Sequence, residues 1–507
     1  MSTLVFLPIL ISLFGGALTL SFWRSILWQK RITLVCASIY LIFAILLQQQ
    51  VMQDGYVVMQ MGNWPAPFGI TLVADILSAT MILLTGIVGF ASALYSMASV
   101  PEQHIRFGYF PLLQLLLAGV SGAFLTGDVF NLFVWFEVML LASFGLLTLG
   151  GERAQLEGAI KYVTINLLSS ALFLSAIGLL YSSAGTLNIA DLSIKLAGVE
   201  EQGLVNALAL MFMVSFSIKA GAFPLFFWLP ASYHTPLVAV SAVFAGLLTK
   251  VGVYALYRFF SVIFIGDIEY THTILLWLGI LTMLTGVLGA AAQFEFRRIL
   301  SFHIISQIGY MLIAFAIFTP LAVIGGVFYI AHHIIVKTNL FLISGLTYQL
   351  TGTHELKAMG GLYRQRPWLA LLFLIPALSL AGLPPLSGFF AKYIVIKAGV
   401  EAGSWWAVGF GLFVGLLTLF SMIKIWAEVF WKPLPQAASL DTSAATTLAT
   451  GVRTTLSPWM LIPVIMLAIM TVSIGLFGEP LYQLAERATS QILNPQGYID
   501  AVLGGAK

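Results

Sequence analysis

Six ionisable side chains lie inside long apolar stretches of this sequence, where a charge finds no water to stabilise it. They are Glu137, Lys219, Lys250, Lys337, Lys392 and Lys424. A charged side chain at the centre of a bilayer costs at least ~2.5–3.5 kcal/mol on insertion scales. A set of this size predicts a role in moving charge. The alternative is that these groups pair with one another only to hold a bundle of helices together.

Glu137 and Lys219 form the pair on which the chemistry is first expected to depend. An apolar bundle favours the neutral form of a lysine, and a nearby carboxylate favours the charged form. A change in the position or charge of Glu137 would therefore switch Lys219 between holding and releasing a proton. A pump or an antiporter requires this chemistry. The pairing is a hypothesis, because the sequence contains no distance between the two residues.

Two lysines stand beside interruptions of their helices. Lys219 is followed by Gly221 and Pro224 within the run 204–232, and Lys392 follows Pro384 and Pro385 within the run 367–398. A broken helix frees backbone carbonyls and amides at membrane depth, which is tolerated beside a cavity or an ion path. Paired interruptions in corresponding positions are typical of internally repeated transporters. A kink made for packing would not explain a lysine beside both breaks.

Lys250 and Lys424 are expected to differ in role. Lys250 lies in the middle of the run 236–260 with no carboxylate nearby in sequence, which favours a proton relay; snorkelling to an interface is the alternative. For Lys424 the interfacial position is the favoured interpretation, because Trp426, Glu428 and Trp431 follow it closely.

Histidines mark a second polar stretch. His332 and His333 precede Lys337, and His333 shares a helix face with this lysine, four residues away. Histidine titrates near neutrality and suits proton transfer, so a relay is expected, with a hydrogen-bonded packing role as the alternative. A metal site is not expected, because adjacent histidines point to different faces and no further ligand stands at a suitable spacing. His234 could gate entry at a helix end or simply terminate a loop.

Composition determines which elements must position these side chains. Of the 507 residues, 60% are apolar and 8% are charged, whereas soluble domains carry roughly a quarter charged residues. The apolar runs predict an all-α polytopic membrane protein of about 14 transmembrane helices, of which the seventh and twelfth are broken. The single cysteine, Cys36, excludes a disulfide framework and thiolate metal sites. No nucleotide-binding loop or zinc motif occurs, so we expect no cofactor and no nucleic-acid partner.

The distribution of charge predicts the orientation. Basic residues concentrate in alternate connections: Arg24, Lys30, Arg31, Arg106, Arg153, Lys161, Arg297, Arg298, Lys357, Arg364, Arg366, Lys432 and Arg453. By the positive-inside rule these connections face the cytoplasm and both termini face outward. The first apolar run lacks the basic segment of a cleavable signal peptide and is expected to be retained. Residues 433–457 form the one extended polar connection. Asp75 could be an outward helix cap or a lipid-side anchor.

At these residues the chain resembles the proton-translocating membrane family shared by NADH:quinone oxidoreductase, membrane-bound hydrogenases and Mrp-type antiporters. The likeness rests on the residues around Glu137, on KAGAFP from Lys219, on the segments 229–236 and 245–258, on 297–310, and on GFFAK ending at Lys392. Within the family the chain is most similar to the D-type subunits of Mrp sodium/proton antiporters, as the residues around His234 and Glu428 and the lysine at position 392 indicate.

The resemblance implies an organisation and a set of roles. It implies an N-terminal three-helix segment (1–108), two inverted five-helix repeats (109–260 and 273–430), and a last part (431–507) with a cytoplasmic loop, a final helix and a tail. The first repeat would carry Glu137, Lys219 and Lys250 as ion-pair partner, proton carrier and relay. The second would carry His332 or His333, Lys337 and Lys392 as the onward path to the outer side.

The expected function is thus that of a secondary transporter subunit in the bacterial plasma membrane. Its expected partners are the other subunits of an antiporter complex, the lipid bilayer, protons and sodium ions, and we expect sodium to cross elsewhere in the complex. The same residues would serve an oxidoreductase or hydrogenase subunit, which would co-purify with flavin or iron–sulfur proteins. A solute symporter and a scaffold are further alternatives. The absence of a polar cluster beyond the charged axis disfavours the first, and the number of buried lysines the second.

Overall fold

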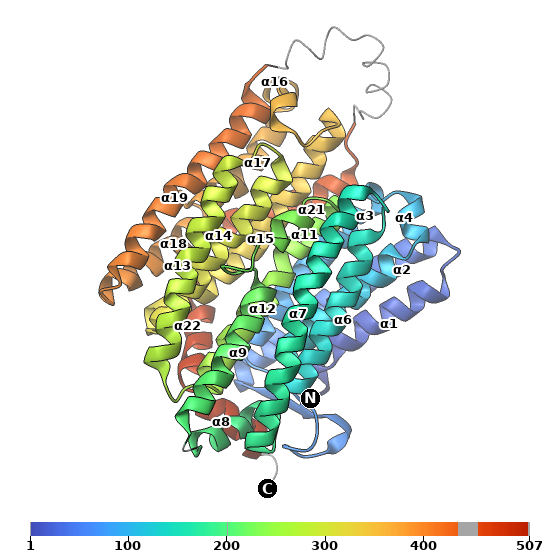
Figure 1. Cartoon of the computed structure of the whole chain (residues 1–507). Coiled ribbons are helices and arrows are strands. Elements are labelled where there is room, and N and C mark those ends of the chain that lie inside the picture. The colour runs from blue at the N-terminus through green and yellow to red at the C-terminus, as the bar shows by residue number, and fades with distance from the viewer. Residues whose placement is uncertain (1, 200, 434–454, 505–507) are drawn as a thin grey trace.

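The protein is a tilted bundle of long helices, shown in Figure 1. The computed structural model describes residues 2–199, 201–433 and 455–504. Within these residues, 11 helices are long and apolar enough to cross a membrane, and three shorter apolar helices accompany them. A mostly helical membrane protein is confirmed, although the expected all-α class is not exact, because two short strands are present. The predicted polar connection at 433–457 lies almost entirely outside the described residues.

The first half of the chain contains two strands and the helices up to residue 262. Their bounds are α1 (Leu7–Ser21), α2 (Ile26–Asp54), β1 (Val57–Gln60), β2 (Thr71–Ala74), α3 (Ile76–Ser99), α4 (Glu102–Arg106), α5 (Tyr109–Leu125), α6 (Val129–Thr148), α7 (Arg153–Ala184), α8 (Ile189–Ala197), α9 (Gln202–Ala220), α10 (Trp228–Ser232), α11 (Val238–Val243) and α12 (Thr249–Val262). Short 3-10 turns precede α1 and follow β1.

The second half consists of helices joined by short connections, with no β-strand element among its described residues. Its helices are α13 (Ile268–Ala292), α14 (Phe296–Ile317), α15 (Pro320–Thr351), α16 (Leu362–Gln365), α17 (Pro367–Ala381), α18 (Ser387–Glu401), α19 (Trp405–Trp426), α21 (Pro458–Leu476), α22 (Glu479–Leu493) and α23 (Gln496–Leu503). The N-terminus and the end of α23 lie at the same end of the bundle, at the bottom of Figure 1. Which side of the membrane this end faces stays a prediction.

Polar residues begin many of these helices, because the first amides of a helix have no partner within it. Asp75 caps α3 through a reciprocal pair of hydrogen bonds with Ser78. It is 2% exposed and forms an ion pair with the buried Arg258 of α12. Asp75 is therefore a helix cap, and the alternative of a lipid-side anchor is wrong. Arg258, which the sequence placed near a connection, is buried in the same ion pair.

Both predicted helix interruptions are present, and each divides one apolar run into two helices. The run 204–232 becomes α9 and α10, and the run 367–398 becomes α17 and α18. Helices α9 and α17 both end at a glycine with left-handed backbone, Gly221 and Gly382. Two further interruptions were not predicted: the π-helical segments Phe244–Leu248, between α11 and α12, and Ala427–Trp431, after α19.

Helix α15 occupies the centre of the bundle, and 94% of the residues in its most apolar stretch are buried. It packs against α14, α18, α21 and α22, and also against α11 and α3. It therefore joins the two halves of the chain. Since α15 carries His332, His333 and Lys337, these side chains lie at the centre of the molecule.

Several elements at the end that carries the termini escaped the sequence analysis. Strands β1 and β2 form a two-stranded antiparallel sheet with Val57 opposite Ala74. Helices α8 and α22 are short and amphipathic, so they lack the apolar run that marks a span. Helix α22 folds back against α15, α3 and α12. The expected C-terminal tail is thus a pair of helices packed on the bundle.

Candidate functional site

Glu137, Ser170 and Lys219 form a hydrogen-bonded chain between three helices of the first half. Ser170 of α7 donates to the Glu137 carboxylate of α6 and accepts a hydrogen bond of 2.9 Å from Lys219 Nζ of α9. Lys219 also donates to the Asn166 carbonyl, at 3.3 Å. The predicted pairing is thus indirect: a hydroxyl stands between the carboxylate and the ammonium, which form no direct ion pair in this structure. A proton could pass between them through the hydroxyl.

Ser170 was missed by the sequence analysis, although a signal was available. It belongs to a Ser-Ser pair, Ser169 and Ser170, in the middle of an apolar run. In the structure the two hydroxyls have different partners. Ser169 donates to the Ser215 carbonyl at 2.8 Å, and Ser170 links Glu137 to Lys219. A pair of small hydroxyl residues is common in membrane helices as a packing device, so its sequence could not distinguish these uses.

Aromatic rings close the site around Lys219. Its Nζ lies 5.5 Å from the centre of the Phe136 ring, and Phe173 and Phe216 meet edge to face beside Phe136 at 5.0 Å. The ammonium therefore gains a cation–π contact in surroundings that exclude water. Lys219 also stands at the C-terminal end of α9, where the helix dipole favours a cation. The helix break thus positions the charge.

Lys250 lies on α12, directly after the π-helical segment. Its Nζ donates to the Ala245 carbonyl at 2.5 Å and to Thr249 Oγ1 at 3.3 Å. A π-turn disrupts the regular ladder of backbone hydrogen bonds, and such turns often occur at functional sites. The side chain is 0% exposed. The alternative of snorkelling to an interface is therefore wrong, and Lys250 is a fully buried amine held by groups of its own helix.

The two adjacent histidines of α15 face different neighbours, as expected. His332 Nδ1 lies 2.8 Å from Ser387 Oγ, at the start of α18. His333 is fully buried, and neither of its ring nitrogens has a hydrogen-bond partner among the described residues. It lies within electrostatic reach of Lys250 and Lys337. His333 is thus within electrostatic reach of one lysine of each half, and His332 faces the second helix break.

Lys337 is held by a backbone carbonyl of the neighbouring helix. Its Nζ donates to the Leu300 carbonyl of α14 at 3.0 Å, and its side chain is 0% exposed.

The described part of the chain contains no cluster of three or more histidine, cysteine or carboxylate side chains that could hold a metal ion.

The second helix break surrounds Lys392 with polar groups. Its Nζ donates to the Ala381 carbonyl, the last of α17, at 3.1 Å and lies 5.1 Å from the centre of the Tyr310 ring. Ser379 and Ser387 face each other across the break at 3.0 Å and connect it to His332. The break thus carries a short chain of hydroxyl and imidazole groups next to a buried lysine. An apolar cavity of about 600 Å³ borders Lys392.

Gly388 allows this close approach of α18 to its surroundings. A side-chain carbon at this position would overlap the Ser379 carbonyl oxygen and lie 2.8 Å from the His332 ring. The lack of a side chain at Gly388 therefore allows the start of α18 to pack closely against the end of α17 and against α15.

His303 of α14 is a second residue that the sequence analysis missed. It is fully buried, and both ring nitrogens lack partners among the described residues. It lies within electrostatic reach of Lys337 and Lys392. The signal was a histidine inside the apolar run 299–318, where an imidazole is as unexpected as a lysine.

Lys424 lies at a helix end within electrostatic reach of His303, and His234 lies in a connection. Lys424 Nζ donates to the Ala291 and Gln293 carbonyls, at 2.8 and 2.7 Å, and so caps the C-terminal end of α13. The interfacial position expected for Lys424 stays a prediction. His234 lies in the connection after α10, where burial and the charges of Arg297 and Arg298 lower its pKa to about 4.

Comparison with known proteins confirms the resemblance seen in the sequence. Residues 126–418 match the family model described as NADH:quinone oxidoreductase/Mrp antiporter, transmembrane. Two proteins named as the D-type subunit of a Na(+)/H(+) antiporter cover 99% of this chain and are themselves covered in full. The protein from Alkalihalophilus pseudofirmus is 46% identical and that from Bacillus subtilis 38% identical.

Solved structures agree with this relationship. A chain of the Mrp complex from a Dietzia species superposes with a TM-score of 0.88 at 33% identity, over 99% of both chains. A chain of respiratory complex I from Thermus thermophilus superposes with a TM-score of 0.80 at 25% identity, over 97% of this chain and 99% of that one. The chain belongs to the NADH:quinone oxidoreductase/Mrp antiporter transmembrane family.

Proposed function

We propose that this chain is the D-type subunit of a multisubunit sodium/proton antiporter and moves protons along its buried lysines and histidines. The observation that carries the proposal is the chain from Glu137 through Ser170 to Lys219. A carboxylate and an amine joined by one hydroxyl can exchange a proton without a large movement. The surrounding aromatic rings exclude water, which would otherwise carry the proton along another route. Relatives named as D-type subunits of Na(+)/H(+) antiporters support the assignment of the ion.

The proposed path crosses both halves of the chain. Glu137 sets the charge state of Lys219, Lys250 relays the proton, and His333 passes it between Lys250 and Lys337. His303, His332 and Lys392 continue the path to the second helix break. The electrostatic proximity of His333 to Lys250 and Lys337, and of His303 to Lys337 and Lys392, supports this order.

We also propose the finer organisation expected from the resemblance: 14 spans, two inverted repeats at 109–260 and 273–430, and termini that face outward. A shared local geometry supports the repeats. Asp128, at the start of α6, pairs through its backbone with Asn188 after α7; Glu295, at the start of α14, pairs likewise with Glu355 after α15. The broken helices α9/α10 and α17/α18 follow these pairs in the same order.

The chain acts in this proposal as a secondary transporter and depends on partner subunits. The Mrp complex among its structural relatives supports such an assembly. Sodium crosses elsewhere in the complex. A role in an oxidoreductase is the second candidate, supported by the likeness to respiratory complex I and to an archaeal sulfane sulfur reductase. Purification with flavin or iron–sulfur proteins, instead of small membrane subunits, would favour it.

The test uses the complete set of subunits in everted membrane vesicles. Collapse of a pH gradient on addition of sodium is followed for the wild type, Lys219→Ala and Glu137→Ala. Lys195→Ala, at an exposed lysine of α8 paired with Asp191, is the matched control. Loss of exchange in both test variants, with the complex still assembled, supports the proposal. Exchange that survives in both would mean that the buried charges are structural.

A further inference from the structure

A buried ion pair lies beside the helix that carries Lys250, at the end of the bundle where the termini lie. It joins Arg258 of α12 to Asp75, the cap of α3. Arg258 is 7% exposed, so its charge is almost completely removed from water. A buried arginine is as costly in a membrane as a buried lysine. The proposed path does not use this pair, so its role has to be sought elsewhere.

Aromatic rings lie beside the guanidinium of Arg258. Its Cζ is 5.4 Å from the centre of the Tyr254 ring and 5.0 Å from the centre of the Tyr498 ring. Its Nη2 also donates to the Tyr254 hydroxyl at 3.1 Å. The Tyr56 ring meets the Tyr498 ring edge to face, with ring centres 6.5 Å apart. These tyrosines are neutral near pH 7, so they stabilise the cation without an opposing charge.

The C-terminal helices cover this ion pair. Tyr498 belongs to α23 and is 3% exposed. Helix α22, which precedes it, packs against α3 and α12. The Gln491 amide of α22 accepts a hydrogen bond of 2.9 Å from the Ile76 amide and donates one of 2.8 Å to the Gly55 carbonyl. The last part of the chain is therefore fastened over Arg258.

The net charge around the ion pair is positive. The Asp75 carboxylate accepts a hydrogen bond of 2.8 Å from the Ser78 amide, in the first turn of α3. The N-terminus of a long helix carries roughly half an elementary positive charge, so α3 already offsets part of the Asp75 charge. The charge of Arg258 is opposed by the remainder. A proton or a sodium ion that approaches this point therefore meets repulsion.

Arg258 stands between Lys250 and the end of the bundle that carries the termini. It follows Lys250 by eight residues on α12, about 12 Å at 1.5 Å per residue. Tyr254 lies one turn from each and donates to the Phe124 carbonyl of α5 at 2.8 Å. The three side chains form a polar column along one side of the helix. A fixed arginine is the kind of barrier that excludes protons from a polar passage through a membrane.

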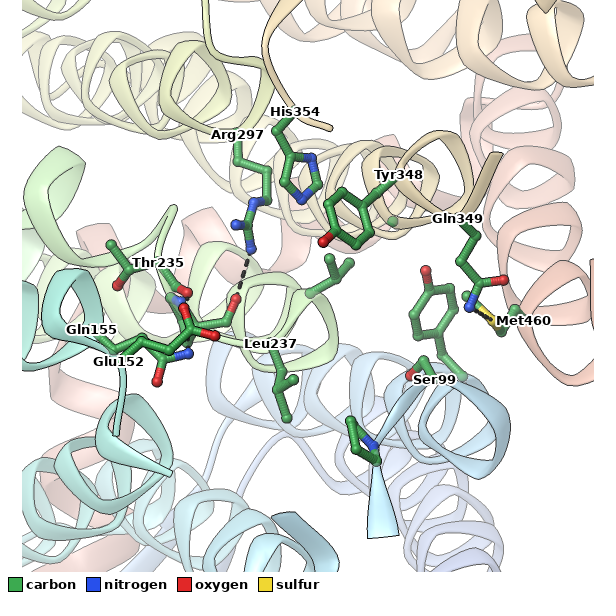
Figure 2. A pocket seen from close by; sticks show the side chains of 15 residues that line it. Ser99, Glu152, Gln155, Thr235, Leu237, Arg297, Tyr348, Gln349, His354 and Met460 are labelled. Carbon is green, nitrogen blue, oxygen red and sulfur yellow. Dashed lines mark hydrogen bonds between the residues drawn. The ribbon is translucent and has the colours of Figure 1, made fainter. Parts of the chain in front are cut away.

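The opposite end of the same helical run is hollow. Val238, at the start of α11, lines a polar cavity of about 310 Å³. Figure 2 shows the side chains of this cavity, among them Arg297, which donates to the Pro236 carbonyl at 2.6 Å. Arg297 thus borders a cavity, whereas Arg258 is enclosed by a carboxylate and aromatic rings. The two ends of the α11/α12 run therefore differ in how they are closed.

We propose that the Asp75–Arg258 ion pair is an electrostatic seal, which stops protons from leaving Lys250 directly towards the end of the bundle that carries the termini. The positive charge of Arg258 is the active part of the seal, and Tyr498 covers it. Protons on the proposed path are thereby directed across α15 into the second half. The proposal rests on the proposed function, which names a path but no barrier beside it.

Passive proton leak tests the seal. A pH gradient is imposed on vesicles that contain the whole complex, in the absence of sodium and potassium, and its decay is followed. Arg258→Gln removes the charge and should raise the decay rate by about tenfold, the lower end of the range over which lining charges change local ion concentration. Arg258→Lys keeps the charge and should hold the gradient as the wild type does.

Asp75→Asn distinguishes a seal from a simple fastener. Asparagine is also a good helix cap, so α3 keeps its cap and Arg258 keeps its charge. The gradient should therefore decay as slowly as in the wild type. A pair that only fastens α3 to α12 would give equal leaks when either partner is neutralised. Lys195→Gln removes an exposed cation of α8, paired with Asp191, and is the control, which should not leak.

Tyr498→Ala provides a second measurement, which decides the matter if Arg258→Gln does not assemble. It removes a ring from the cover and leaves both charges in place, so the gradient should decay faster than in the wild type. Unchanged decay in the assembled Arg258→Gln complex would overturn the seal, as would an equal leak in Asp75→Asn. If Arg258→Gln is not assembled, unchanged decay in Tyr498→Ala would overturn it.

The outcomes separate the seal from the function. A tight Arg258→Gln complex whose exchange is still abolished by Lys219→Ala would refute the seal and leave the proposed function standing. If Lys219→Ala and Glu137→Ala leave exchange intact, the proposed function fails whatever the leak through Arg258→Gln.

Discussion

Lys219 of the first half is stabilised differently from the other buried lysines, because Lys250, also in the first half, is held by the Ala245 carbonyl as the second-half lysines are held by carbonyls. In the first half, Lys219 reaches a carboxylate, Glu137, through one hydroxyl. In the second half, Lys337 and Lys392 are held by the backbone carbonyls of Leu300 and Ala381. Among the described residues, neither of these two lysines forms an ion pair. A carbonyl dipole stabilises an ammonium less than a carboxylate does.

This difference suggests a division of labour within one bundle. A lysine with a carboxylate nearby retains its proton more readily, and a lysine supported by carbonyls releases it more readily. In the proposed path, Lys219 is therefore the lysine suited to hold a proton, and the lysines held by carbonyls are suited to pass it on. In the proposed path, His333 of α15 connects the two halves, because it lies within electrostatic reach of Lys250 and of Lys337.

The strongest test of this comparison removes a second-half lysine. Lys337→Ala should lower proton transport by about a hundredfold, the lower range for loss of a positioned proton-transfer group. Sodium-dependent collapse of a pH gradient in everted vesicles measures the effect. Lys397→Ala, at an exposed lysine of the same half paired with Glu401, should have no effect. Full activity of Lys337→Ala would restrict the path to the first half.

Ser170→Ala sharpens the comparison in the first half. It removes the hydroxyl that joins Glu137 to Lys219 while leaving both charges in place, so transport should fall by about tenfold, less than after loss of the lysine itself. Ser169→Ala is the matched control, because the neighbouring hydroxyl bonds the Ser215 carbonyl instead. Equal effects of the two substitutions would show that both serines act through packing.

Gly388→Ala tests the close packing at the second break. The added methyl group would overlap the Ser379 carbonyl oxygen, and overpacking of this kind costs about 1–3 kcal/mol. The thermal midpoint of the purified complex should fall, and transport should decline with it. Gly409→Ala, where no heavy atom lies within 4 Å, should leave the midpoint unchanged. An unaltered midpoint for Gly388→Ala would contradict the described packing.

The smallest effect on transport is expected at Glu295, in the connection before α14. Burial, opposed in part by Arg297, raises the pKa of this carboxyl from 4.5 to about 7. A raised folded-state pKa means that its contribution to stability is complete below pH 4.5 and is lost as the pH rises through about 7. The wild type should lose thermal stability across this window.

Glu295→Gln supplies the comparison for that window. Its amide keeps an oxygen that can accept the hydrogen bond from the Arg298 amide but cannot ionise. Thermal unfolding in detergent between pH 4 and 8 should therefore show a weaker pH dependence for the variant than for the wild type. The same slope in both proteins would assign the pH dependence to another group.

Much of the architecture followed from local sequence. Apolar runs predicted the long helices, since backbone groups in lipid must bond within their own segment. Proline and glycine predicted both breaks, because proline lacks the donor that a continuous helix needs. The π-helical turn before Lys250 was not predictable, since Phe244–Leu248 contains no residue that requires it. Helix α22 was missed because its sequence is amphipathic and its partners, α15 and α3, are distant in sequence.

The sequence by itself identified most of the ionisable side chains inside apolar runs: Glu137, four lysines of the proposed axis and the histidines of α15, but neither His303 nor the buried Arg258. This follows because a charge in an apolar run is visible without any knowledge of the fold. Only the tertiary structure decided how they are joined. Ser170 bridges Glu137 to Lys219, and His303 lies within electrostatic reach of Lys337 and Lys392, because helices far apart in sequence pack side by side. Distances between helices depend on how the helices pack, and this packing cannot be predicted from any one segment of the sequence.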